Sequence, residues 1–142
     1  ERVVNAIKSQ MQENKSKVIV EHLDLTSLNS VEKFSDKILS NYVFLDVLIN
    51  NAGVNKIDSI NEITENDWDW INSINLRGPF LLTRAVADIM KKNGYGRIVN
   101  ISSIYGISGV DQRIYGTSKL NSPVSYAASK GGILNCSLSS NA

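Results

Sequence analysis

Two segments of the chain pair a tyrosine with a lysine four residues later. They are YGTSK at 115–119 and YAASK at 126–130. A tyrosine hydroxyl can give or take a proton, but an ordinary pKa of about 10 makes it a poor base near neutral pH. A lysine ammonium held beside it favours the phenolate, and a spacing of four puts both side chains on one helix face. Either pair could therefore carry acid–base chemistry, provided that it lies on a helix.

The residues around each pair distinguish them. Pro123 lies four residues after Lys119 and stops a helix there, so Tyr115 and Lys119 could share only an isolated turn. Such turns are marginal in water and hold side chains loosely. After Lys130, apolar and small residues continue at helical spacing. We therefore predict that Tyr126 and Lys130 are the catalytic pair on a true helix, with Tyr115 as a loop residue available to line a substrate pocket.

The elements that must position this pair alternate along the chain. We expect strands at 18–25, 44–51 and 97–102, and helices with apolar stripes at 3–11, at 31–38, from 64 to about 92, and from 126 onward. Thr64 and Asp67 form a capping box at the start of the long helix. The run at 44–51 is apolar enough for burial on both faces, which is typical of a central parallel strand. The alternation predicts an α/β fold with helices on both sides of a parallel sheet.

Ligands of such sheets bind beyond the carboxyl ends of the strands. The segments expected at that edge are Asp24 with Leu25, Asn50 to Gly53, and Ser102 with Ser103. Ala52 and Gly53 would let a flat ring approach the backbone, although a tight strand-to-helix turn needs small residues too. The Asp24 carboxylate could accept a hydrogen bond from an adenine amino group, or could cap the next helix.

Pro79 lies four residues after Asn75 within the long helical pattern. Proline lacks the N–H that would bond the Asn75 carbonyl, so we predict that this carbonyl is free within the helix. A free buried carbonyl needs another partner, which is commonly water. The alternative interpretation is a kink that serves packing alone.

The composition limits the function classes. The 142 residues suffice for one domain, and with 42% hydrophobic and 20% charged residues they are typical of a soluble protein. A formal charge of +1 gives no surplus with which to bind nucleic acid, and no apolar run is long enough to cross a membrane. The single Cys136 cannot form an internal disulfide; we expect it to be buried, in a cytoplasmic protein. His22 has no nearby metal-ligand partner, so no metal site is expected.

Four motifs in order give a family resemblance. LINNAG at 48–53, INLRGPFLLTRA at 74–85, GRIVNISS at 96–103 and YAASKGG at 126–132 together resemble the short-chain dehydrogenase/reductase superfamily. This resemblance implies a Rossmann-type three-layer α/β/α fold with a parallel sheet. It also implies NAD or NADP as cofactor and a small-molecule alcohol or carbonyl as substrate. Residues 1–142 would then be a single partial domain, incomplete at both ends, lacking the first βαβ unit and the C-terminal strands.

The resemblance also implies roles for individual residues. Tyr126 would be the general acid and base, Lys130 would assist it, Ser103 would polarise the carbonyl, and Asn75 would hold a water that relays protons to the lysine. Cofactor contacts would come from Asp24, Leu25, Asn51, Ala52, Gly53, Tyr126 and Lys130. Members usually form homodimers or homotetramers through the two long helices that begin near Thr64 and Ser125. Trp68 and Trp70 on the first of these could lie in that interface or in the core.

One departure from the ordinary pattern bears on the substrate. Ser103 precedes Tyr126 by 23 residues, about twice the usual separation, and the extra segment is approximately VDQRIYGTSKLNS. A longer spacing is similar to the extended, nucleotide-sugar-modifying branch, so we suggest a polar, sugar-like substrate. A nucleotide-sugar epimerase or dehydratase is the enzymatic alternative. A non-catalytic fragment or binding module is the third, because the 142 residues given contain no strand followed by a glycine-rich phosphate loop.

Overall fold

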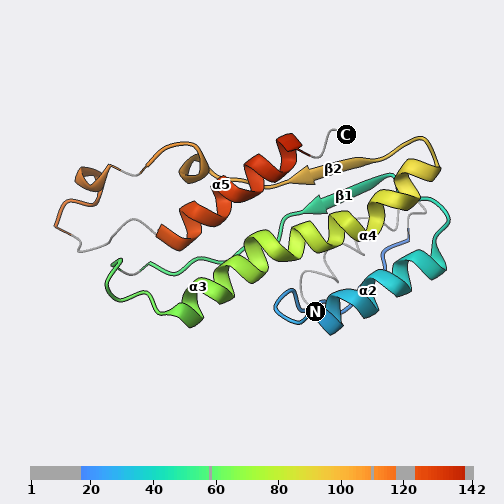
Figure 1. Ribbon diagram of the computed structural model, residues 1–142, viewed down its shortest axis with the longest axis horizontal. Helices are drawn as coiled ribbons and strands as arrows, with labels where there is room; N and C mark the ends of the chain where they lie inside the picture. The colour runs from blue at the N-terminus through green and yellow to red at the C-terminus, as the bar shows by residue number, and fades with distance from the viewer. Residues whose placement is uncertain (1–16, 58, 110, 118–123, 140–142) are drawn as a thin grey trace.

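The computed structural model describes residues 17–57, 59–109, 111–117 and 124–139 (Figure 1). In chain order the elements are α2 (Leu28–Asn41), β1 (Val47–Asn50), α3 (Glu65–Asn72), a π-helix η2 (Ser73–Arg77), α4 (Gly78–Lys92), β2 (Arg97–Asn100), two 3₁₀-helices η3 (Ile104–Gly106) and η4 (Gln112–Tyr115), and α5 (Val124–Ser139). The helix expected at 3–11 lies outside the described residues. No helix among the described residues has the length and apolar character needed to span a membrane.

Strands β1 and β2 pair in parallel, with Asn50 opposite Asn100 at their carboxyl ends. Alternate side chains of these strands face α4 and α5. The Asn50 amide donates to Asn100 Oδ1 at 2.8 Å, and the Asn100 amide donates to Ser137 Oγ of α5 at 2.8 Å. Both strands point toward the end of the molecule where η3 and η4 lie (Figure 1). The parallel pairing that the sequence pattern predicted is therefore confirmed.

The other face of the sheet is exposed within the described part of the chain. Val47 and Ile49 of β1 retain 46% and 60% of their accessible surface, and Val99 of β2 retains 43%. The expectation that the run at 44–51 is buried on both faces is wrong here, because α2, α4 and α5 all pack on one side of the sheet. The described residues thus form the sheet and one helical layer of a partial Rossmann-type α/β fold.

The segment at 18–25 does not form the strand expected there. Its β-branched residues favour an extended backbone, but a strand needs a hydrogen-bonded neighbour, and the described sheet consists of β1 and β2. Ile19 and Val20 are exposed, whereas Leu23 and Leu25 turn inward. The segment therefore contributes to the core without joining the sheet.

A small apolar core joins this segment to the helices. Leu25, Val31 of α2 and Leu82 of α4 are buried together, and Leu48 of β1 packs against them. Ser27 caps α2 by accepting a hydrogen bond from the Ser30 N–H at 3.3 Å. The apolar stripe predicted for this helix accordingly faces the core.

The long helical segment begins with the predicted capping box. Thr64 accepts from the Asp67 N–H, and the Asp67 carboxylate accepts in return from the Thr64 N–H. Hydrogen bonds from Lys56 and Thr64 lower the pKa of Asp67 to about 2. The segment reaches Lys92 as expected, although it is interrupted by the π-helix η2 just before Pro79.

The π-helix has a local cause. Pro79 offers no N–H to the Asn75 carbonyl, so regular α-helical hydrogen bonding cannot run through this point. Instead the Gly78 N–H bonds to the Ser73 carbonyl, five residues back. The predicted free carbonyl of Asn75 stays a prediction, but the interruption occurs where Pro79 placed it.

Candidate active site

Tyr126 and Lys130 both lie on α5, as predicted, and the two face one another. Lys130 is 5% exposed, and its ammonium nitrogen is 5.7 Å from the centre of the Tyr126 ring. The ammonium donates to the Ile101 carbonyl just beyond β2 at 2.5 Å. Burial lowers the pKa of Lys130 from its ordinary value. A charged group has therefore been desolvated next to a tyrosine, which is a common arrangement at catalytic sites.

The competing tyrosine lies outside regular helix. Tyr115 is the last residue of the four-residue η4, which Gly116 ends with a φ of 51°. Its sequence partner Lys119 and the following Pro123 are outside the described residues. Tyr115 is thus a loop residue, as the pattern predicted, and it lies close enough to Tyr105 for their hydroxyls to be 3.4 Å apart.

Asn75 is held by three hydrogen bonds. Its side chain is 1% exposed, accepts from the Val54 N–H at 2.8 Å and donates to the Val54 carbonyl at 2.9 Å. The same amide donates to Ser129 Oγ of α5 at 3.0 Å. Asn75 therefore ties the segment after β1 to the helix that carries Tyr126 and Lys130. This bridging role of its side chain was not foreseen from the sequence, which directed attention to its backbone carbonyl.

Asn51, Ala52 and Gly53 follow β1 and are exposed. A methyl group built on Gly53 would lie 3.6 Å from both Asn75 Oδ1 and Lys130 Nζ, in ordinary van der Waals contact. The glycine is thus required neither by its backbone conformation nor by a protein neighbour. What it preserves is open space beside the Lys130 ammonium, where a flat group could approach.

The two serines after β2 have different partners. Ser102 Oγ donates to the Lys130 carbonyl at 2.8 Å, which is a structural link to α5. Ser103 is half-buried and caps η3, accepting from the Tyr105 N–H at 3.2 Å. A serine hydroxyl that accepts one hydrogen bond retains its own O–H to donate. Ser103 is therefore suited to bind a substrate oxygen, whereas Ser102 is already committed.

Asp24 and Leu25 are less directly connected to this group. The Asp24 carboxylate accepts from both the N–H and the hydroxyl of Thr26, which lowers its pKa. Ser27 rather than Asp24 caps α2, so the capping interpretation of Asp24 is wrong. Leu25 has its side chain in the core, and only its backbone remains for contact with a ligand.

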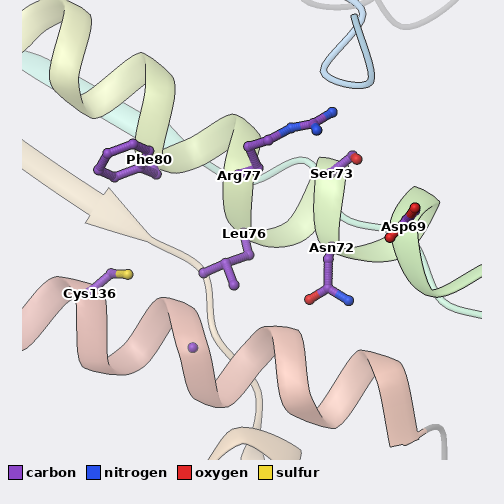
Figure 2. Close-up of a pocket in the computed structure, with 8 residues that line it drawn as sticks. Asp69, Asn72, Ser73, Leu76, Arg77, Phe80 and Cys136 are labelled. Carbon is purple, nitrogen blue, oxygen red and sulfur yellow. The ribbon is translucent and has the colours of Figure 1, made fainter. Parts of the chain in front are cut away.

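A cavity of about 480 Å³ lies on another side of the π-helix and contains none of the predicted site residues. In Figure 2, Asn72 and Leu76 project toward α5, and Cys136 faces them from that helix. Cys136 is exposed, so the expectation that it is buried is wrong. Together with Gly132 it forms the α5 side of this groove. Trp68 and Trp70 are 43% and 42% exposed, which excludes the core position considered for them.

The geometry thus gathers a phenol, a buried ammonium, a hydroxyl and an open glycine at the carboxyl ends of two parallel strands. In open α/β sheets, this edge is where ligands bind. The class of protein that the fold and site define is a Rossmann-type α/β protein with acid–base groups at the ligand edge of its sheet.

Comparison with known proteins identifies the family. The family model for short chain dehydrogenase matches residues 1–140. The chain is 39% identical over 112 residues to a cyclopentanol dehydrogenase of Comamonas sp. (strain NCIMB 9872), covering 79% of this chain and 41% of that protein. It is 35% identical over 112 residues to a 3-oxoacyl-acyl-carrier-protein reductase of Thermotoga maritima, covering 79% and 42%. The chain spans about two fifths of the length of these curated relatives.

Solved structures of short-chain oxidoreductases share the fold of this chain. A metagenomic short-chain oxidoreductase in complex with NADP superposes with a TM-score of 0.82 at 27% identity, covering 97% of this chain and 58% of that one. A bulky-bulky ketone specific alcohol dehydrogenase from Comamonas testosteroni gives a TM-score of 0.79 at 25% identity, covering 97% and 51%. This chain belongs to the short chain dehydrogenase family, and its fold is the Rossmann-type fold that the motifs predicted.

Proposed function

We propose that the protein is an NAD- or NADP-dependent oxidoreductase that interconverts an alcohol and a carbonyl compound. The observation that carries the proposal is the buried Lys130 ammonium, placed between the Tyr126 ring and the open side of Gly53. Burial of a lysine is rare, because removing its charge from water is costly, so a buried lysine indicates a functional site. Two relatives of this chain by sequence are a dehydrogenase and a reductase, which supports the same chemistry.

The residues present are compatible with a nicotinamide cofactor. In the part of the chain that the structure describes, the Lys130 ammonium has one hydrogen-bond acceptor, the Ile101 carbonyl. An ammonium has three N–H donors, so further donors are available for ribose hydroxyls. The exposed Asn51, Ala52 and Gly53 would hold the nicotinamide ribose, and Asp24 with the Leu25 backbone would contact the adenine. The bound nicotinamide would supply or accept the hydride.

The protein's own groups would handle the proton and the oxygen. In reduction, negative charge develops on the carbonyl oxygen, and the Ser103 O–H would hold that oxygen while the Tyr126 O–H gives it a proton. The Lys130 ammonium would stabilise the resulting phenolate and pass a proton toward it. In oxidation the Tyr126 phenolate would take the alcohol proton. Asn75 would hold the relay water through its backbone carbonyl, since its side chain is already bonded to Val54 and Ser129.

The test is a comparison of two matched tyrosine variants of the full-length protein. Tyr126→Phe should lower kcat by about 10²- to 10⁴-fold, the usual range for loss of a general acid, while Tyr115→Phe stays within a few-fold of wild type. The assay follows the absorbance of NADPH or NADH at about 340 nm, the band of the reduced nicotinamide. The carbonyl probes are cyclopentanone, acetoacetyl-CoA and a UDP-sugar. If Tyr115→Phe is the inactive variant, the assignment of Tyr126 is wrong.

The same assay addresses the substrate class. The long Ser103-to-Tyr126 segment with its polar composition favours a sugar-like substrate, so the UDP-sugar should be the preferred probe. Preference for acetoacetyl-CoA would overturn that choice of substrate while leaving the oxidoreductase proposal intact. An epimerase or dehydratase would instead convert the sugar with tightly held cofactor and no net change in absorbance. Absence of cofactor binding in calorimetry would favour the non-catalytic alternative.

We also propose that a second copy of the chain covers the groove lined by Leu76, Phe80 and Cys136. Phe80 is 50% exposed there, and Asp69 and Arg77 at the same surface provide opposite charges for a two-fold contact. Phe80→Glu should convert a dimer or tetramer to a smaller species in light scattering. An unchanged mass for Phe80→Glu would contradict this interface.

A further inference from the structure

A second aromatic ring lies against the proposed catalytic tyrosine. The Tyr105 and Tyr126 ring centroids are 6.3 Å apart with an interplanar angle of 85°, an edge-to-face contact. Aromatic pairs of this geometry stabilise one another beyond the area that they bury. Tyr105 is half-buried, so it restricts the positions that the Tyr126 ring can take.

The backbone that carries Tyr105 is fixed to the helix that carries Tyr126. A methyl group on Gly106 would come within 2.6 Å of the Lys130 carbonyl oxygen, so η3 and α5 touch backbone to backbone. The Ser102 hydroxyl donates to that same carbonyl at 2.8 Å. The Tyr105 N–H is in turn bonded to Ser103 Oγ. Tyr105 and Tyr126 therefore occupy a common rigid frame.

The hydroxyl end of Tyr105 is held from the long loop. The Tyr115 and Tyr105 hydroxyl oxygens are 3.4 Å apart, and hydrogen bonding to Tyr105 raises the pKa of Tyr115. Tyr115 ends η4, whose first turn is organised by Asp111 accepting from the Arg113 N–H at 3.0 Å and pairing with its guanidinium. The segment from Asp111 to Tyr115 thus reaches Tyr126 through one intermediate ring.

We propose that Tyr105 is a positioning residue for Tyr126 and that Tyr115 holds Tyr105 in place. The extra length between Ser103 and Tyr126 then has a mechanical use, because it supplies the residue that orients the reactive phenol. This inference rests on the proposed function only in taking Tyr126 as the acid–base group. The contacts themselves do not depend on the identity of the substrate.

The experiment uses three single variants of the full-length protein, one double variant and one control. Tyr105→Leu removes the ring and should lower kcat about three- to tenfold, with the KM for NADPH unchanged and the alkaline limb of the kcat–pH profile displaced. Tyr105→Phe keeps the ring and should restore most of that loss. Tyr105→Phe and Tyr115→Phe remove the same hydroxyl contact, so each should lower kcat about twofold and the double variant no further. Tyr95→Leu, an exposed tyrosine before β2, should leave kcat as in wild type.

A second readout is independent of turnover. With ¹³C-labelled tyrosine rings, the Tyr126 resonance is assigned by its loss in Tyr126→Phe. It should shift in Tyr105→Leu because the edge of the neighbouring ring is gone, and remain in place in Tyr95→Leu. An unshifted resonance, or additive losses in the double variant, would overturn the inference. If instead Tyr126→Phe remains active while the Tyr105→Leu shift is seen, the positioning contact stands and the proposed function fails.

Discussion

The carboxyl end of the β1–β2 sheet and the open face of the same sheet differ in how their side chains are satisfied. At the carboxyl end, the buried Asn75 and Lys130 both bond to backbone groups of segments distant in the sequence. On the open face, Val47, Ile49 and Val99 are exposed, although they are good strand formers. The site is therefore held together by hydrogen bonds between segments distant in the sequence. The apolar residues on the open face of the strands contribute little to its stability. Substitutions should therefore be felt strongly at the first region and weakly at the second.

The largest effect on stability is expected for Asn75→Ala. The substitution leaves the partly buried Val54 N–H and carbonyl without their partner, which should cost about 3 kcal/mol in the free energy of unfolding. Asn41→Ala is the control, because among the described residues the Asn41 amide donates within its own helix, to the Lys37 carbonyl. Urea titration of both variants measures the difference. Equal losses in the free energy of unfolding would show that the hydrogen bonds from Asn75 to Val54 add no stability beyond an ordinary bond within a helix.

The next effect concerns the contact between η3 and α5. Gly106→Ala would force a methyl group against the Lys130 backbone, which should destabilise the protein by about 2 kcal/mol and lower turnover. Gly109→Ala is the matched control, since nothing lies within 4 Å of its added methyl group. Thermal unfolding and steady-state kinetics of the pair test this contact. A fully stable, active Gly106→Ala would mean that η3 can move away from α5 freely.

Within the sheet, neighbouring residues of β1 should behave in opposite ways. Leu48→Ala opens a gap beside the core of Leu25, Val31 and Leu82, and should cost about 2 kcal/mol of unfolding free energy. Ile49→Ala removes a side chain that is 60% exposed and should stay within about 0.5 kcal/mol of wild type in the same assay. A large loss for Ile49→Ala would reveal that this face is covered in the full-length protein.

The smallest effect is a pH dependence. Burial lowers the pKa of Lys130 below its ordinary 10.5, so between the two values the unfolded chain binds more protons than the folded chain. Stability contributed at this residue should therefore rise with pH across that window. Lys130→Met should abolish the rise, which is measured as the difference between the two proteins in urea titrations from pH 8 to about 10.5. An identical pH profile for both would contradict the desolvation of Lys130.

Part of the site could be predicted from the sequence because the pattern that identifies it involves residues close together in the chain. The i to i+4 spacing of Tyr126 and Lys130 on α5 needs no tertiary information. The effect of Pro123 on the rival pair stays a prediction, because Lys119 and Pro123 lie outside the described residues. The long helix and its capping box at Thr64 were likewise predicted from neighbours along the chain.

What was missed depends on contacts between distant segments. Cys136 has the same neighbours in sequence whether it faces the sheet or a groove, so its exposure required the packing of α5. The bonds of Asn75 to Val54 and Ser129 span 21 and 54 residues, and no local pattern encodes such pairs. The exposure of Ile49 could not be predicted either. An apolar strand sequence indicates that burial is favourable, but it does not say whether another element covers that face.

The π-helix η2 joins α3 and α4 into one continuous helical segment, but it changes the direction in which the side chains of α4 point. It carries one residue more per turn than an α-helix, so every side chain after Arg77 is rotated by roughly 100° from where an unbroken helix would put it. That offset lets Asn75 face Val54 while Leu82 and Val86 face the core. An α-helix running unbroken through the same residues would instead aim the apolar stripe of α4 in the wrong direction. The wider turn at Ser73–Arg77 is therefore as much a requirement of the core as the identity of any residue in it.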